Sequence, residues 1–157
     1  MMINIVQNVN EIRVGKIFYM VMAFLGEKDN DYIEKVTVIK DPYVVELGTK
    51  TIKHDFLFFD ADYMSDYHNE RIKTSYATTD TNIPVNNYNM HCMFKDRESA
   101  EKYIELINNN DIDALYKLGV LTKEKYKNMY RIKSFNESTD DDWLCDDNET
   151  DDENWII

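Results

Sequence analysis

The stretch IFYMVMAFL, residues 17–25, is apolar on both of its alternating sets of positions. Such a run is typical of a strand in the middle of a sheet, where both faces are covered. Nine residues could also form a buried helix, but the aromatic and β-branched content favours a strand. We therefore expect a central strand over residues 16–25.

The residues that follow predict further strands. GEKDND, residues 26–31, has the composition of a turn, and YIEKVTVIK, residues 32–40, alternates as the returning strand of a hairpin should. We expect Asp41-Pro42 to end that strand, because proline cannot donate to a ladder. YVVELG and TIKHDFLFF predict one or two more strands, separated at Gly48.

A polar, irregular stretch runs from Asp60 to Asn89 and is long for a loop in a compact domain. It predicts either short strands that the pattern does not reveal or an interaction surface. After it, YNMHCMF, residues 88–94, is interpreted as another strand.

Three short helices are predicted after this strand. Asp96 is a suitable N-cap for the first helix, whose buried stripe comprises Ala100, Tyr103, Ile104 and Ile107. Asp111 caps IDALYKL, which Gly119 ends, and Thr122 caps KEKYKNMYRIK. The predicted fold is thus α+β: an antiparallel sheet of four to five strands followed by three short helices, with residues 1–133 as one domain and residues 134–157 as an acidic tail.

The net charge of −12 is unevenly distributed. Residues 134–157 contain ten acidic residues and no Lys or Arg, whereas residues 117–133 contain six basic residues and one acid. Residues 1–116 carry a net charge of −7. A basic segment therefore lies directly before a strongly acidic one.

The sequence also excludes several classes of protein. The longest apolar run has nine residues, too few for a membrane span, and the N-terminus lacks the pattern of an export signal, so we expect a cytoplasmic protein. Four glycines cannot form a phosphate-binding loop or a dinucleotide fingerprint, and we expect no cofactor. His91 and Cys92 are adjacent on a strand, where they point to opposite faces and cannot form a catalytic dyad.

One acidic segment, DADYMSDYH, could gather oxygen ligands around a divalent cation if it folds back on itself. Its candidate ligands are Asp60, Asp62, Asp66 and His68. The spacing matches no EF-hand, since the central glycine and the closing glutamate are missing. A solvated acidic turn is the favoured interpretation, and a small metal-dependent hydrolase stays an alternative.

The basic segment, residues 117–133, could bind nucleic acid. Lys123, Lys127 and Arg131 recur at i, i+4 and i+8, and Tyr126 and Tyr130 could stack on bases. A solvated helix face is the simpler interpretation, and the acidic remainder of the body opposes direct contact with nucleic acid.

The acidic tail contains both tryptophans of the chain. Trp is strongly enriched at binding hot spots, so these side chains predict a contact surface. The expected anchors are Trp143, Leu144, Trp155, Ile156 and Ile157, and the expected steering charges are Asp140, Asp141, Asp142, Asp146, Asp147, Asp151 and Asp152. The tail could dock on a partner, fold back on the basic helix of its own chain, or have no function.

Resemblances to known families add to this. Residues 115–130, LYKLGVLTKEKYKNMY, resemble the C-terminal helix hairpin of SHOCT-type proteins, although Lys125 stands where that family has an acid. The abundance of Asn, Lys, Ile and Tyr resembles that of small accessory proteins of AT-rich bacteriophage genomes. DDENWII is similar in kind to the acidic tails of bacterial single-stranded-DNA-binding proteins, but it lacks their final Pro-Phe.

These observations predict a non-enzymatic binding protein of a phage or mobile element. We expect it to modulate a host protein that has a basic and apolar site, such as an enzyme that binds nucleic acid, with the tail acting as a partial nucleic-acid mimic. The alternatives are a nucleic-acid accessory protein that uses residues 117–133 and a structural component of a virion.

Overall fold

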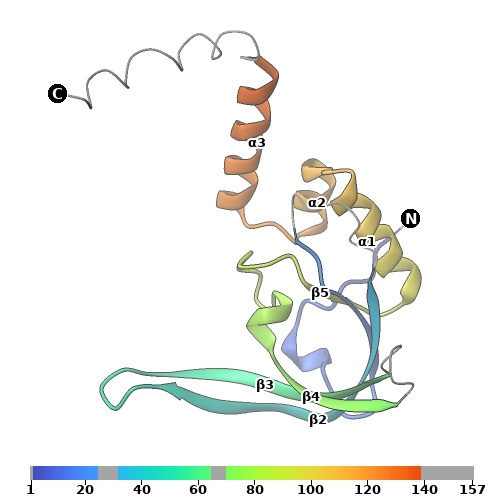
Figure 1. The fold of residues 1–157 in the computed structure, drawn as a ribbon, viewed down its shortest axis with the longest axis vertical. Helices are drawn as coiled ribbons and strands as arrows, with labels where there is room; N and C mark the ends of the chain where they lie inside the picture. The colour runs from blue at the N-terminus through green and yellow to red at the C-terminus, as the bar shows by residue number, and fades with distance from the viewer. Residues whose placement is uncertain (1, 25–31, 65–69, 139–157) are drawn as a thin grey trace, which may run out of the picture. The chain divides into compact units, whose positions relative to one another are not determined.

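The computed structural model describes residues 2–24, 32–64 and 70–138. The chain divides into two compact units, Met1–Thr122 and Lys123–Ile157. The first unit contains a five-stranded antiparallel sheet and helices α1 and α2, and the second contains helix α3 (Figure 1). The predicted α+β class and the order of sheet before helices are confirmed. Whether residues 134–157 form a separate tail stays a prediction.

The sheet has the strand order β4-β3-β2-β1-β5, and each neighbouring pair is antiparallel. Its strands are β1 (Ile17–Val21), β2 (Ile33–Gly48), β3 (Lys53–Met64), β4 (Arg71–Ala77) and β5 (Cys92–Phe94). The helices are α1 (Arg97–Asn108), α2 (Ile112–Leu118) and α3 (Lys123–Ser138), with short 3-10 turns η1 (Val9–Glu11) and η2 (Thr78–Thr81).

Strand β1 lies inside the sheet, as its sequence predicts, and carries a core on each face. On one face Phe18 and Met20 belong to a buried cluster with Val36, Phe59 and other apolar residues. On the opposite face β5 contributes Cys92 and Phe94, which pack on Tyr103 of α1. The cover is incomplete, because Ile17 at the start of β1 is exposed.

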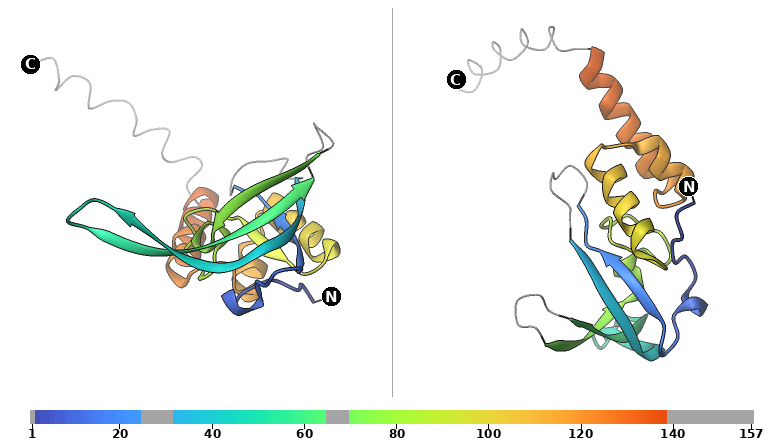
Figure 2. Two further views of the ribbon diagram at one scale, coloured as in Figure 1. Left: turned by 90° about the horizontal axis from the view of Figure 1, so that it is seen from below. Right: turned by 90° about the vertical axis from the view of Figure 1, so that its right-hand side faces the viewer.

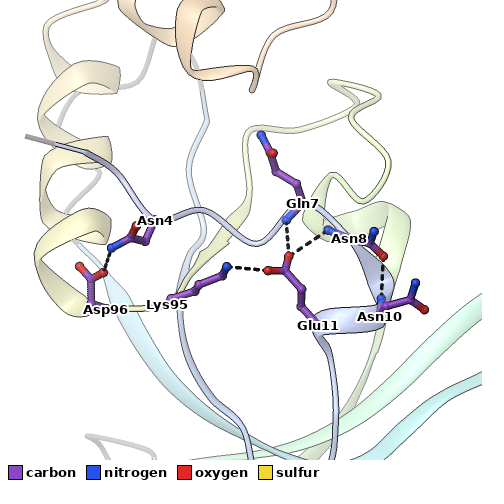
Figure 3. A network of polar contacts seen from close by, with 7 residues as sticks. All are labelled: Asn4, Gln7, Asn8, Asn10, Glu11, Lys95 and Asp96. Atoms are coloured by element: carbon purple, nitrogen blue, oxygen red, sulfur yellow. Dashed lines mark hydrogen bonds and ion pairs between the residues drawn. The ribbon is translucent and has the colours of Figure 1, made fainter.

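The first of these cores is closed by the N-terminal segment. Val6 and Ile12 are buried in it, and Val6 donates a backbone hydrogen bond to the Met93 carbonyl at 2.9 Å. Figure 3 shows the polar contacts that hold this segment in place: Lys95 pairs with Glu11, and Asn4 donates to Asp96 at 2.7 Å. Glu11 also accepts from the backbone amides of Gln7 and Asn8, which completes a capping box.

Asparagine side chains build the loop after β4. Asn82 is buried and adopts the left-handed conformation, with φ 59°. Its Nδ2 donates to the carbonyls of Asn89 and His91, and its Oδ1 accepts from the amides of Asn86 and Asn87. The described part of the stretch predicted to be irregular contains the end of β3, then β4, η2 and this loop, so the alternative of unrecognised strands is confirmed.

Three predicted strands have wrong bounds. The strand predicted over residues 16–25 is only Ile17–Val21, and residues 22–24 lie outside it. Strand β2 does not end at Asp41-Pro42 but continues to Gly48, because register shifts between Val38 and Tyr43 accommodate a residue that cannot donate. The strand predicted over residues 88–94 is only Cys92–Phe94, because the Asn82 side chain takes the place of a ladder around Asn89 and His91.

The caps of the first two helices are as predicted. Asp96 accepts from the Ser99 amide at 2.8 Å, and Asp111 accepts from the Ala114 amide at 3.2 Å. Gly119 ends α2 in the left-handed conformation, with φ 87°. Ala100, Tyr103 and Ile107 are buried, whereas Ile104 is only half-buried. None of the helices in the described ranges has the length and hydrophobicity that crossing a bilayer requires.

Candidate functional site

The longest feature of the sheet is a two-stranded hairpin, residues 43–58, which we call the arm. Strand β1 pairs with β2 only over residues 33–37, and β4 reaches β3 only from Phe58 onward. The arm therefore extends past the rest of the sheet, as Figures 1 and 2 show for β2 and β3. Among the described residues, no third strand pairs with β2 over 43–48 or with β3 over 53–57.

One face of the arm is a largely apolar stripe of three cross-strand pairs, of which the last includes a histidine. The register places Tyr43 opposite Phe58, Val45 opposite Phe56 and Leu47 opposite His54. The opposite face has the apolar pair Val44 and Leu57, followed by Glu46 and Asp55. The exposed fractions are 62% for Val44, 46% for Leu47 and 61% for Ile52, which are high for apolar side chains in a folded sheet.

Polar contacts fix the base of the arm. The Tyr43 hydroxyl and the Ser75 hydroxyl each donate to Oδ1 of Asp60 at 2.6 Å. The ammonium of Lys40 lies 4.2 Å from the centre of the Tyr43 ring. The hydrogen bonds from Ser75 and Tyr43 hold the pKa of Asp60 below its ordinary value, and the Asp60 contact raises the pKa of Tyr43. The arm thus starts from an ordered junction of three strands.

The tip of the arm requires glycine. Gly48 has a φ of 139°, and a Cβ at this position would lie 2.1 Å from the Ile52 carbonyl oxygen. The turn is closed by the Thr49 amide, which donates to that oxygen at 2.8 Å, and by the Ile52 amide, which donates to the Thr49 hydroxyl. The backbone therefore turns here without a side chain at residue 48.

A second feature is a pocket of about 650 Å³ in the first unit. Its apolar lining is Met20, Met22, Phe24, Tyr76 and Tyr88, and its polar lining is Asp80, Thr81, Asn89 and His91. These residues come from β1 and the residues that follow it, the end of β4, η2 and the asparagine-built loop. The pocket is therefore assembled from segments far apart in the sequence.

Some of the polar atoms around this pocket have hydrogen-bond partners and one has none. The Tyr76 hydroxyl donates to buried Glu34 at 2.7 Å, and the Tyr32 hydroxyl donates to the same carboxylate at 3.1 Å. Burial and the Glu34 contact raise the pKa of Tyr76, so its hydroxyl stays a donor. In contrast, Nε2 of His91 is buried without a hydrogen-bond partner in the described part of the chain.

Burial lowers the pKa of His91, an effect that exceeds the opposing influence of Asp80 and favours the neutral ring. Its ring meets Phe24 edge to face, with centroids 5.1 Å apart. Cys92 is buried on the other face of the sheet, where its Sγ lies 3.5 Å from the Tyr103 hydroxyl, and burial raises the pKa of its thiol to about 12. The two side chains thus have different neighbours, as adjacent residues at the start of a strand should.

Neither the favoured interpretation of DADYMSDYH as a solvated acidic turn nor the alternative of a cation-binding loop holds where the structure describes this segment. Asp60 and Asp62 lie in β3 rather than in a loop, and they contact Tyr43, Ser75 and Arg71. In the described ranges, no group of three His, Cys, Asp or Glu side chains is placed to hold a metal ion. Asp66 and His68 lie outside the described residues.

The predicted basic face lies on α3. Lys123, Lys127 and Arg131 are exposed, and the rings of Tyr126 and Tyr130 are 6.2 Å apart. Their use for nucleic-acid binding stays a prediction. The tail residues predicted as anchors and steering charges, from Asp140 to Ile157, lie outside the described residues.

Comparison with known proteins identifies a family to which this chain is similar. The model of the family described as Phage g100-like protein matches residues 6–107, well over half of the chain. The chain belongs to this family. None of the curated proteins and none of the solved structures matches it.

The g100-like region contains the whole sheet, the arm, the pocket and nearly all of α1. The predicted resemblance to phage proteins is therefore confirmed. The match ends before α2 and α3, so it does not extend to the segment that resembles a SHOCT-type hairpin.

The sequence alone did not predict the arm or the pocket. A signal for the arm was present, because two apolar alternating runs flank Gly48 at a hairpin-like distance. The pocket had no comparable signal, since its lining residues are brought together by the sheet register and by the Asn82 contacts.

Proposed function

We propose that this g100-like chain is a non-enzymatic phage accessory protein that binds a host protein and modulates it. The observation that carries the proposal is the arm, with exposed apolar side chains on both faces and, among the described residues, strand edges that pair with no further strand. Natural sheets usually cover, shorten or charge such edges. An arm left open in this way suits β-augmentation or insertion between apolar surfaces of a partner.

The charge of the arm supports the same function. Residues 43–58 contain two acids and two bases, so the arm is neutral in a chain with a net charge of −12. Its charged strand residues, Glu46, Lys53 and Asp55, lie on the face opposite Tyr43, Val45 and Leu47, so that face can meet an apolar surface without desolvating them. The chain as a whole is acidic and is repelled by acidic surfaces. We therefore assign the apolar contact to the arm.

The acidic tail is proposed as the second contact. Its tryptophans and terminal isoleucines would anchor it, and its aspartates would steer the chain toward a basic site and speed association. If the host protein normally binds nucleic acid, the tail would compete there as a partial mimic. The target is thus a host protein with both an apolar and a basic site.

Capture from a host-cell lysate tests this proposal. The wild-type chain is compared with a Val44→Thr, Leu47→Thr variant, which keeps β-propensity but removes one exposed apolar side chain from each face of the arm. Val14→Thr is the matched control, because Val14 is 60% exposed and lies outside the arm. We expect the arm variant to lose the captured host protein and the control to retain it; equal capture by all three chains would refute the role of the arm.

The alternative function is binding of single-stranded nucleic acid by α3, which the exposed Lys123, Lys127 and Arg131 favour. It predicts salt-dependent binding to an oligonucleotide that becomes tighter when residues 138–157 are deleted. Absence of binding by the deleted chain at low salt would eliminate this alternative.

A further inference from the structure

We propose that the pocket beside His91 binds a small aliphatic amine in its ammonium form. This inference is independent of the arm and the tail. Three observations carry it: the aromatic walls of the pocket, the carboxylates at and below its surface, and the unpartnered His91 nitrogen.

The walls suit a cation that carries apolar carbon. Phe24, Tyr76 and Tyr88 line the pocket, and an ammonium group is attracted to the electron-rich face of such rings. The Tyr76 hydroxyl donates to the Glu34 carboxylate at 2.7 Å, which makes its ring more electron-rich. Met20 and Met22 add polarizable thioethers that pack against a methylene chain.

The charges in and near the pocket have the sign that a cation requires. Asp80 lines the pocket, and Glu34 lies buried behind Tyr76, while no Lys or Arg is among the described lining residues. An anionic ligand would meet these carboxylates without a compensating base. An ammonium ligand would be attracted both by these carboxylates and by the aromatic rings.

The unpartnered nitrogen favours a ligand with N–H donors. Nε2 of His91 is buried without a partner in the described part of the chain, and leaving a buried polar atom unpaired is unfavourable. In the tautomer protonated at Nδ1, this nitrogen is a hydrogen-bond acceptor. A primary ammonium has three N–H donors and can bond both the neutral imidazole and the Asp80 carboxylate. A tetramethylated ammonium has none and would leave Nε2 unpaired.

The size of the pocket favours a free ligand. The pocket is open to solvent on one side, and its volume of about 650 Å³ is large enough to hold a whole small molecule. We therefore infer a free amine with several methylenes, such as a polyamine, rather than a single lysine side chain from a partner.

The test uses the full chain with labelled methionine methyl groups and histidine rings, titrated with spermidine at about 0.15 M salt, where long-range attraction to the acidic chain is screened. We expect saturable NMR shifts at Met20, Met22 and His91. The comparison ligands are tetramethylammonium, butyrate, and N-acetyl-lysine N-methylamide. We expect each of them to bind at least 10-fold more weakly.

Matched variants separate the pocket from general charge attraction. Asp80→Asn and Tyr88→Ala should each weaken spermidine binding at least 5-fold, and Tyr88 is 90% exposed, so its removal should leave the fold intact. The controls are Asp55→Asn and Tyr130→Ala, which lie outside the pocket and should bind spermidine as the wild-type chain does. Shifts at His91 that are unchanged by Asp80→Asn, or equal binding of butyrate, would overturn the proposal, as would tighter binding of the lysine derivative.

Discussion

At the scale of single residues, Glu11 links the N-terminal segment to the end of β5. Lys95, and after it the amides of Gln7 and Asn8, lower the pKa of Glu11 below its ordinary value of 4.5. A carboxyl with a lowered pKa in the folded state stabilises the fold above its unfolded pKa and loses that contribution as the pH falls through the folded value. The stabilisation from Glu11 should therefore be present at neutral pH and disappear below pH 4.5.

The first prediction follows from this residue. Glu11→Gln should lower the free energy of unfolding at pH 7 by about 1 kcal/mol, as expected for loss of a partly exposed ion pair with its hydrogen bonds. The difference from wild type, measured by urea denaturation, should shrink as the pH falls from 4.5 toward 3. Glu70→Gln is the control, because Glu70 is exposed; an equal effect of both substitutions would contradict the assignment.

The second prediction concerns Asn82, whose side chain organises the loop beside the pocket. Asn82→Ala should cost about 2–3 kcal/mol, because it removes hydrogen bonds from buried groups and places alanine in the left-handed region. Asn110→Ala measures the cost of the left-handed backbone alone, since Asn110 has a similar φ of 53° but an exposed side chain. Thermal or urea unfolding would measure both, and equal losses would mean that the side-chain bonds contribute nothing.

At the scale of elements, the arm is predicted to be a locally stable unit that depends on its tip. Gly48→Ala should open the arm, because the new Cβ would clash with the Ile52 carbonyl and the φ of 139° disfavours any side chain. Hydrogen exchange should then speed up at residues 53–57 and stay slow where β1 pairs with β2. Gly15→Ala is the control, since Gly15 has a φ of 91° but a Cβ added there would meet no atom within 4 Å.

Much of the sheet and helix arrangement could be predicted from the sequence because local signals agree with the fold. The apolar run at 17–21 became an interior strand, between β2 and β5, and Asp96, Asp111 and Gly119 cap their helices as expected. The end of β2 was predicted wrongly at Pro42, because a proline ends a strand only where the register with the neighbouring strand cannot shift. A strand tolerates proline next to an irregular ladder position. The apolar pattern of one strand does not show how that strand pairs with its neighbour, so the irregularity could not be predicted.

The candidate sites could be predicted far less well. The apolar alternation of residues 43–58 was visible, but whether β1 and β4 cover it is a property of strand lengths across the sheet. His91 was considered only beside Cys92, its neighbour in sequence, whereas Phe24, Asp80 and Tyr88 reach it through the fold. When the lining residues of a pocket come from distant segments, their spacing in the sequence forms no motif that could indicate the pocket.

At the scale of the whole molecule, charge is divided among a mildly acidic body, a basic segment and ten acidic residues after residue 133. Deleting residues 138–157 should leave the urea unfolding of the remaining chain unchanged, because the core of the described part of the chain is built from residues 6–121. Host-protein capture should fall and should lose most of its salt dependence. Capture that is unchanged in amount and in salt dependence would remove the tail from the proposed function.

The contact assigned to the arm can be tested most directly by site-specific photocrosslinking in infected or lysate-treated samples. A photoreactive residue at Leu47 is compared with one at Val14, both at exposed apolar positions. The proposal predicts a covalent adduct with a host protein from position 47 and none from position 14. Adducts only from position 14, or adducts from position 47 only with a second copy of this chain, would contradict it.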